Sequence, residues 1–141
     1  MPFYVFRLDV SPLTPATNPA RRTLLLEPGT LFRTYVQFPR GCGGLVHAQI
    51  LRGGTVIYPA PPDVTLASDG YVIAIEDEYP IPQAEEWSLI AWSEDDTYPH
   101  RIEAWLNVRA PRGRAIVDAA RALFEALRAP PSAATSPPQE A

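Results

Sequence analysis

Prolines are unusually frequent in this chain, which contains 17 of them among its 141 residues. Average usage is roughly 5%. Proline fixes φ and lacks a backbone N–H donor, so it is poorly tolerated inside helices and central strands. We therefore expect short strands that are joined by stiff turns and extended segments.

Alternating apolar and polar residues predict about eight strands. The clearest covers residues 101–109, where Ile102, Ala104, Leu106 and Val108 face one way and Trp105 faces the other. The others are predicted at residues 3–10, 22–26, 31–38, 45–52, 55–58, 71–76 and 87–92. Turn signals at short spacing, with no strand–helix–strand alternation, predict an all-β antiparallel sandwich or jelly roll.

Several details of this fold follow from local patterns. Residues 31–38 are predicted to place Phe32, Thr34, Val36 and Phe38 on one face. Gly53 and Gly54 predict a two-residue hairpin, and the segment between Trp92 and Arg101 is also interpreted as a hairpin turn.

The predicted core covers residues 23–110, with residues 1–10 containing the first strand. Residues 11–22 are rich in proline and are expected to form either an exposed arm, ordered by a neighbouring molecule, or a long crossing loop. Residues 129–141 contain mainly Pro, Ser, Ala and Thr, and are expected to be a disordered tail.

Residues 112–128 contain helix-forming residues throughout and are followed by Pro130 and Pro131, so they predict one C-terminal amphipathic helix. The polar residues fall on one narrow stripe: Arg114, Asp118, Arg121, Glu125 and Arg128. A helix that lies on its own sheet needs an apolar stripe of only about 100° or somewhat more. Two interpretations remain open: a helix sunk deep against the sandwich, or one that is also covered by another subunit, for example in a self-associating bundle.

The net charge of −4 hides a segregation along the chain. Residues 53–100 carry ten acidic and no basic residues, while all twelve arginines lie in the flanking segments. This separation favours electrostatically complementary contacts between subunits. An acidic balance without a basic stripe argues against nucleic acid as a partner. No apolar run approaches membrane-spanning length and no secretory leader is evident, so we expect synthesis in the cytoplasm and no membrane partner.

No residue pattern indicates catalysis, a cofactor or a metal. Glu94, Asp95, Asp96 and His100 lack the spaced oxygen ligands and the glycine of a calcium loop. His47 has no ligand or catalytic partner at a suitable spacing, and Cys42 has neither a nearby base nor a second cysteine. The chain is therefore predicted not to be an enzyme.

Aromatic residues near the C-terminal half form a candidate binding face. If strands 87–92 and 101–109 pair across the intervening turn, Trp92 and Trp105 lie near each other. Such a face has three interpretations: a second buried side of the sandwich, an anchor for a protein interface, or a platform for sugar rings.

The stretches FPRGCGGLVHAQILRGG (38–54) and WSEDDTYPH (92–100) resemble short proteins from phages of thermophilic bacteria. The virion class that they resemble is the small β-sandwich head-decoration, or auxiliary capsid, proteins. The resemblance implies a homo-oligomer, with a trimer favoured, that binds a major capsid or other lattice protein on the outer capsid surface of the virion and stiffens the shell.

The sequence therefore predicts a structural assembly protein, with a carbohydrate-binding or adhesion module as the alternative. The residues expected to form its interfaces are Ile116, Ala120, Leu123, Phe124, Leu127, Trp92 and Trp105.

Overall fold

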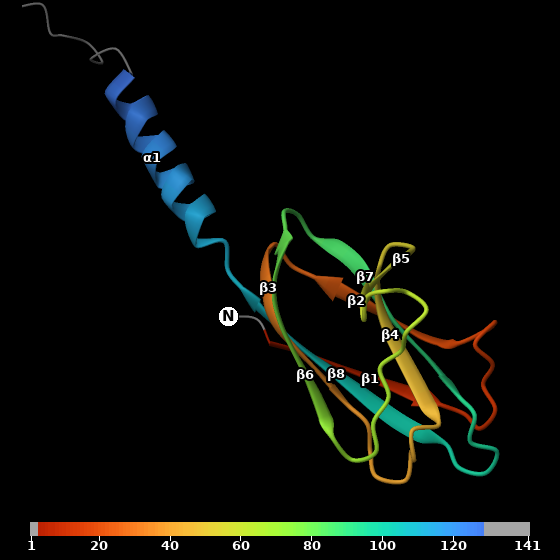
Figure 1. The fold of residues 1–141 in the computed structure, drawn as a ribbon. Coiled ribbons are helices and arrows are strands. Elements are labelled where there is room, and N and C mark those ends of the chain that lie inside the picture. Colours follow the sequence, from red (N-terminus) through yellow and green to blue (C-terminus); the bar gives the residue numbers. More distant parts are fainter. Residues whose placement is uncertain (1–2, 129–141) are drawn as a thin grey trace, which may run out of the picture. The chain divides into compact units, whose positions relative to one another are not determined.

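The computed structural model describes the backbone of residues 3–128 and the side chains of residues 3–111 and 120–128. Eight strands precede one helix (Figure 1). The strands belong to one compact unit that ends at Ala110, and the helix belongs to a second unit. The elements are β1 Phe3–Val10, β2 Ala20–Leu26, β3 Gly29–Gln37, β4 Val46–Arg52, β5 Thr55–Tyr58, β6 Val72–Ile81, β7 Glu85–Ser93, β8 His100–Arg109 and α1 Arg112–Arg128.

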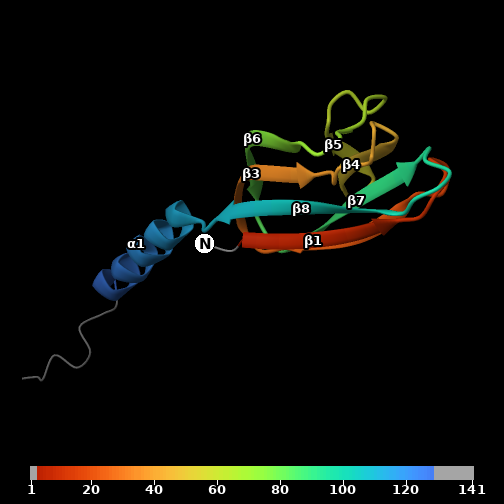
Figure 2. The ribbon, with the colours of Figure 1, turned by 90° about the horizontal axis from the view of Figure 1, so that it is seen from below.

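The strand pairing is that of one long hairpin folded back on itself. β1 pairs with β8, β2 with β7, β3 with β6 and β4 with β5, all antiparallel. Two further pairs, β3 with β8 and β4 with β7, complete the sheets. Sheet A has the order β1-β8-β3-β6, and Figure 2 shows these four strands side by side. Sheet B has the order β2-β7-β4-β5. This is a jelly roll, and the predicted all-β sandwich with one C-terminal helix is confirmed.

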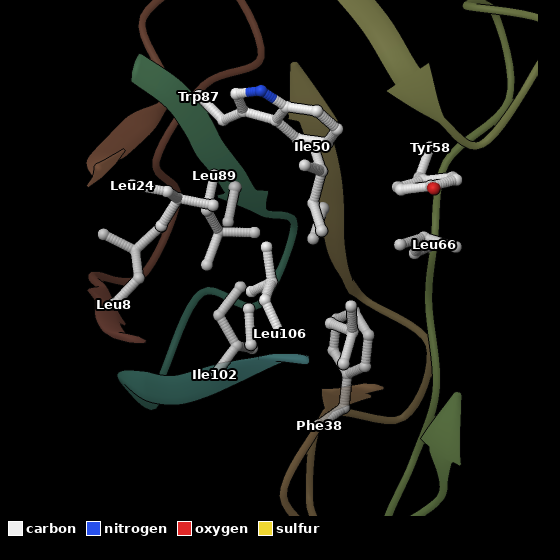
Figure 3. Packing of buried hydrophobic residues seen from close by; sticks show 14 of the residues in the cluster. Leu8, Leu24, Phe38, Ile50, Tyr58, Leu66, Trp87, Leu89, Ile102 and Leu106 are labelled. Atoms are coloured by element: carbon white, nitrogen blue, oxygen red, sulfur yellow. The ribbon is translucent and has the colours of Figure 1, made fainter. Parts of the chain in front are cut away.

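The core lies between the inner faces of the two sheets (Figure 3). In β8, Ile102, Ala104, Leu106 and Val108 are fully buried, as their alternation predicts. Trp87 from sheet B is also fully buried and packs edge-on against Tyr79 of sheet A, with ring centroids 5.2 Å apart. Burial of this apolar surface from both sheets provides the main stabilisation of the sandwich.

The segment between β7 and β8 is not the hairpin turn that the sequence predicts. β7 belongs to sheet B and β8 to sheet A, so residues 94–99 cross from one sheet to the other. The prediction failed because adjacent strands in a sequence often pair, whereas in a jelly roll the eighth strand pairs with the first and third.

Of the two alternatives for the proline-rich segment, the structure shows the crossing loop. Residues 11–19 connect β1 in sheet A to β2 in sheet B, and β2 begins at Ala20, two residues before the predicted start of this strand at Arg22. The Leu13 amide donates to the Asp95 carbonyl at 2.9 Å, and the Ser93 amide donates to the Thr14 carbonyl at 3.0 Å. The loop is thus held by its own chain, and the expectation that it needs a neighbour to be ordered is wrong.

β3 contains an irregularity that the sequence pattern did not predict. Its register with both β6 and β8 shifts between Leu31 and Arg33. Leu31 is buried in consequence, whereas Phe32 is only partly buried and lies against the Arg109 guanidinium, 4.7 Å from its ring centroid. Phe32 therefore does not share the buried face of Thr34, Val36 and Phe38, because a β-bulge changes the alternation of side chains.

α1 spans Arg112–Arg128, as predicted. Within the described part of the chain, no helix has both the length and the apolar character that a membrane span requires. The tail at residues 129–141, which we expected to be disordered, lies outside the described residues.

Candidate interaction surfaces

Taken by itself, the described part of α1 carries several exposed apolar side chains. Leu123, Phe124 and Leu127 are 63%, 58% and 77% exposed, and Ala120 is exposed as well. Ala120, Leu123 and Leu127 follow one another at intervals of three and four residues, so they share one side of the helix. The Arg128 guanidinium lies over the Phe124 ring, 5.3 Å from its centroid. Ile116, the fifth predicted interface residue of this helix, is among the residues whose side chains are not described.

The outer face of sheet A carries three aromatic side chains and one valine, which together we term the aromatic strip: Phe3, Val5, Tyr35 and Trp105. In the register of the sheet, Trp105 lies between Val5 of β1 and Tyr35 of β3. Trp105 meets Phe3 and Tyr35 edge to face, with centroids 6.2 and 6.4 Å away. Phe3 and Val5 are 53% and 43% exposed. Trp105 points away from the core, as its alternation predicts.

Charged residues border the aromatic strip. Arg7 donates to Glu103 at 3.0 Å on one side, and Arg33 donates to Glu76 at 3.1 Å on the other. The Trp105 indole N–H also donates to Glu103, at 3.0 Å. An apolar centre within a charged rim is the composition of many protein interfaces.

Trp92 is not part of this strip. It lies in β7 of sheet B, opposite His47 of β4, and its ring stacks on the imidazole with centroids 5.8 Å apart. The expectation that Trp92 and Trp105 lie near each other is therefore wrong, because their strands belong to different sheets and both side chains point outward. The sequence signal for the aromatic strip was instead the presence of Phe3, Val5 and Tyr35 at outward positions of their strands.

The segregated charges meet within the chain. Arg33 pairs with Glu76, Arg52 with Glu85 and Arg109 with Glu78. The jelly roll places the acidic strand β6 beside β3 and the acidic strand β7 beside β4, both of which carry arginines, and Arg109 at the end of β8 reaches Glu78 of β6. These charges are therefore used within the chain, and their use in contacts between subunits stays a prediction.

Arg52 and Glu85 form the most connected of these pairs. The guanidinium makes two bonds to the carboxylate, at 2.8 and 2.9 Å, and lies 5.2 Å from the Tyr79 ring centroid. Burial by itself favours a raised pKa of Glu85, but the hydrogen bonds from Trp87 and Arg52 outweigh it and hold this pKa below its usual value. The cluster joins β4 and β7 of sheet B to β6 of sheet A and is structural.

Asp95, His100, Cys42 and His47, the candidate catalytic or metal-binding groups, are buried or make contacts within the chain. The Asp95 carboxylate contacts the His100 imidazole at 2.7 Å and accepts from the Thr97 amide at 2.9 Å. Cys42 is fully buried, and this burial, together with the Asp69 and Asp95 carboxylates, raises its pKa to about 11. A buried thiol of this kind is a poor nucleophile at neutral pH. His47 hydrogen-bonds to the Thr65 hydroxyl at 2.8 Å.

Among the residues with described side chains, no three His, Cys, Asp or Glu residues gather in a way that could hold a metal ion. No protein-family model matches the sequence, and no curated protein matches it.

Proposed function

We propose that this chain is a non-enzymatic structural protein that oligomerises and stabilises a protein shell, as an auxiliary or decoration protein on the outer surface of a phage capsid. The observation that carries the proposal is the apolar side of α1, which is exposed when the helix is taken by itself. Leu123, Phe124 and Leu127 would gain roughly 25 cal/mol for each Å² of apolar surface that a second molecule removes from water.

Two further observations support the proposal. Jelly rolls are recurrent building blocks of viral capsids, so the fold is one that such proteins use. The stretches at 38–54 and 92–100 resemble decoration proteins, for which a trimer on a capsid lattice is typical. In the structure these stretches contain the β3–β4 loop, β4 and the β7–β8 loop.

The location on a virion is tested by proteomics of purified particles of the phage that encodes the chain. We expect the chain in intact particles at a stoichiometric amount, and its release under conditions that leave the shell closed. Its absence from purified particles would overturn the proposal.

The aromatic strip supports a second candidate, a carbohydrate-binding module, because jelly rolls also form lectin domains. The geometry favours this candidate less. Trp105 is inclined by 71° to both Phe3 and Tyr35, so these rings do not form one flat platform. A glycan array with the full chain, and with Trp105→Ala as control, tests it; binding that depends on Trp105 would favour this candidate over the structural one.

A further inference from the structure

The two sheets of the sandwich have four edge strands, namely β1 and β6 in sheet A and β2 and β5 in sheet B. An edge strand presents unpaired backbone N–H and C=O groups, which can pair with another chain. Natural proteins protect such edges with charges, prolines, bulges or short strands.

Three of the four edges carry such protection. β6 contains three consecutive acidic residues, Glu76–Glu78, followed by Pro80. β2 has Arg21 and Arg22 near its beginning. β5 is only four residues long.

β1 has neither a pair of like charges, nor a proline, nor a bulge, and it is not short. It is eight residues long, contains no proline, and pairs with β8 without a register shift from Phe3 to Val10. Its exposed Phe3 and Val5 continue the aromatic strip to the edge of the sheet. Its two charged residues, Arg7 and Asp9, have opposite signs and lie two positions apart on the outer face.

We propose that β1 pairs antiparallel with β1 of a second copy of this chain, centred on Leu8. Residues opposite each other in an antiparallel pair share one face of the sheet, so outward residues must meet outward residues. Centring on Arg7 or Asp9 would place like charges together, and centring on Phe6 would place Arg7 opposite Val5. Centring on Leu8 places Arg7 of each copy opposite Asp9 of the other and pairs Phe6–Val10 of the two strands, so the exposed Phe3 and Val5 lie outside the paired segment.

This register also continues the ion pairs that each copy already contains. Arg7 bonds Glu103 at 3.0 Å, and Asp9 bonds Arg101 at 2.8 Å. Across the junction the order of residues becomes Glu103, Arg7, then Asp9 and Arg101 of the second copy. The signs alternate along the whole row, which is the charge complementarity that favours a second copy as the occupant.

The inference deepens the proposed function, because it names a second contact between copies besides the one through α1. Its test therefore uses the full chain with Leu123→Gln and Leu127→Gln, which weakens the contact through the helix. Association of this chain is measured by sedimentation equilibrium, and three charge-swapped variants are compared with it.

The first variant, D9R/R101D, swaps the two charges of one ion pair, so the pair itself is retained within each copy. Across the junction, however, it places a second positive charge opposite Arg7 at both ends. We expect Kd to increase at least about tenfold. The second variant, D9R/R101D combined with R7E/E103R, restores opposite charges across the junction and is expected to recover most of the affinity. The control, R33E/E76R, exchanges an ion pair between β3 and β6 on the same face and should leave Kd unchanged.

A mixture of R7C and D9C chains tests the register directly. In the proposed pairing the two positions are directly opposite, within the Cα spacing of a disulfide, so oxidation should yield covalent dimers in the mixture more than in either chain alone.

The inference is overturned if the L123Q/L127Q chain is monomeric at every concentration, or if D9R/R101D alters Kd no more than R33E/E76R does. A failure of the proposed contact through α1 gives a different result. In that case L123Q/L127Q would assemble to the same extent as the natural chain.

Discussion

Asp95 and His100 form a nearly buried pair, in which the carboxylate and the imidazole Nε2 are 2.7 Å apart. The same carboxylate accepts from the amides of Thr97 and Tyr98, at 2.9 and 3.3 Å. Asp95 therefore fixes the course of the β7–β8 crossing, and its carbonyl also holds Leu13 of the β1–β2 loop at 2.9 Å. One residue thus connects two of the loops at this end of the jelly roll.

These contacts make stability dependent on acid pH. The hydrogen bond from His100, followed by that from Thr97, lowers the pKa of Asp95 below its usual value of 3.8. Its contribution is therefore complete above that value and is lost as the pH falls through it towards the lower pKa of the folded state. We expect Asp95→Asn to destabilise the chain at pH 7 and to flatten the decline of stability below pH about 4. Urea unfolding at pH 7 and pH 3 measures this effect; exposed Asp63→Asn is the control, and an equal effect of both substitutions would contradict the assignment.

Gly29 is required by a close approach between strands. Its φ is +156°, and a Cβ atom at this position would lie 2.2 Å from the Arg109 carbonyl oxygen. Gly29→Ala is therefore expected to cost about 2–4 kcal/mol of the free energy of unfolding, since backbone must move to relieve the overlap. Gly54→Ala is the matched control, because no atom lies within 4 Å of its added Cβ. Equal urea midpoints for the two variants would show that the β2–β3 turn has room for a side chain.

Trp87 joins the core to the Arg52–Glu85 pair. Its ring is fully buried and its indole N–H donates to Glu85 at 2.7 Å. Trp87→Phe removes both the donor and part of the packed volume, so we expect a loss of about 2–3 kcal/mol in chemical denaturation. The half-buried Trp105→Phe should lose less than about 1 kcal/mol. A larger loss at Trp105 would indicate that the outer face of sheet A contributes more to folding than the core cluster.

Cys42 should react slowly with thiol reagents in the folded chain. Its pKa is raised from 9.0 to about 11, so the thiolate fraction at pH 8 falls by about 100-fold, and full burial slows access further. Reaction with a disulfide reagent at pH 8 is expected to be rapid in denaturant and slow without it. Rapid labelling of the folded chain would show that the β3–β4 loop opens readily.

Much of the fold could be predicted because burial on one face of a strand produces a simple alternation. β8 is the clearest case, with Ile102, Ala104, Leu106 and Val108 all inward and Trp105 outward. Strand order could not be predicted in this way, because alternation specifies which side of a strand is buried and not which strand lies beside it. For this reason Trp92 and Trp105 were expected together, although a sheet crossing separates them.

The candidate surfaces also differ in how far the sequence predicts them. The apolar side of α1 is local to one helix, so its residues could be listed from their spacing. The aromatic strip combines β1, β3 and β8, which are distant in the sequence, and depends on their register. The exposed edge of β1 also follows from the sheet order alone, since no property of residues 3–10 identifies an edge strand.

The assembly of the full chain through α1 is tested most directly by multi-angle light scattering of two matched variants. L123Q/L127Q places two glutamines on the exposed apolar side of the helix, and R121Q/E125Q places two on its polar stripe, with similar helix propensity. We predict that the natural chain and R121Q/E125Q form the same oligomer, and that L123Q/L127Q forms a smaller species at the same concentration. An identical mass for all three chains would contradict the account.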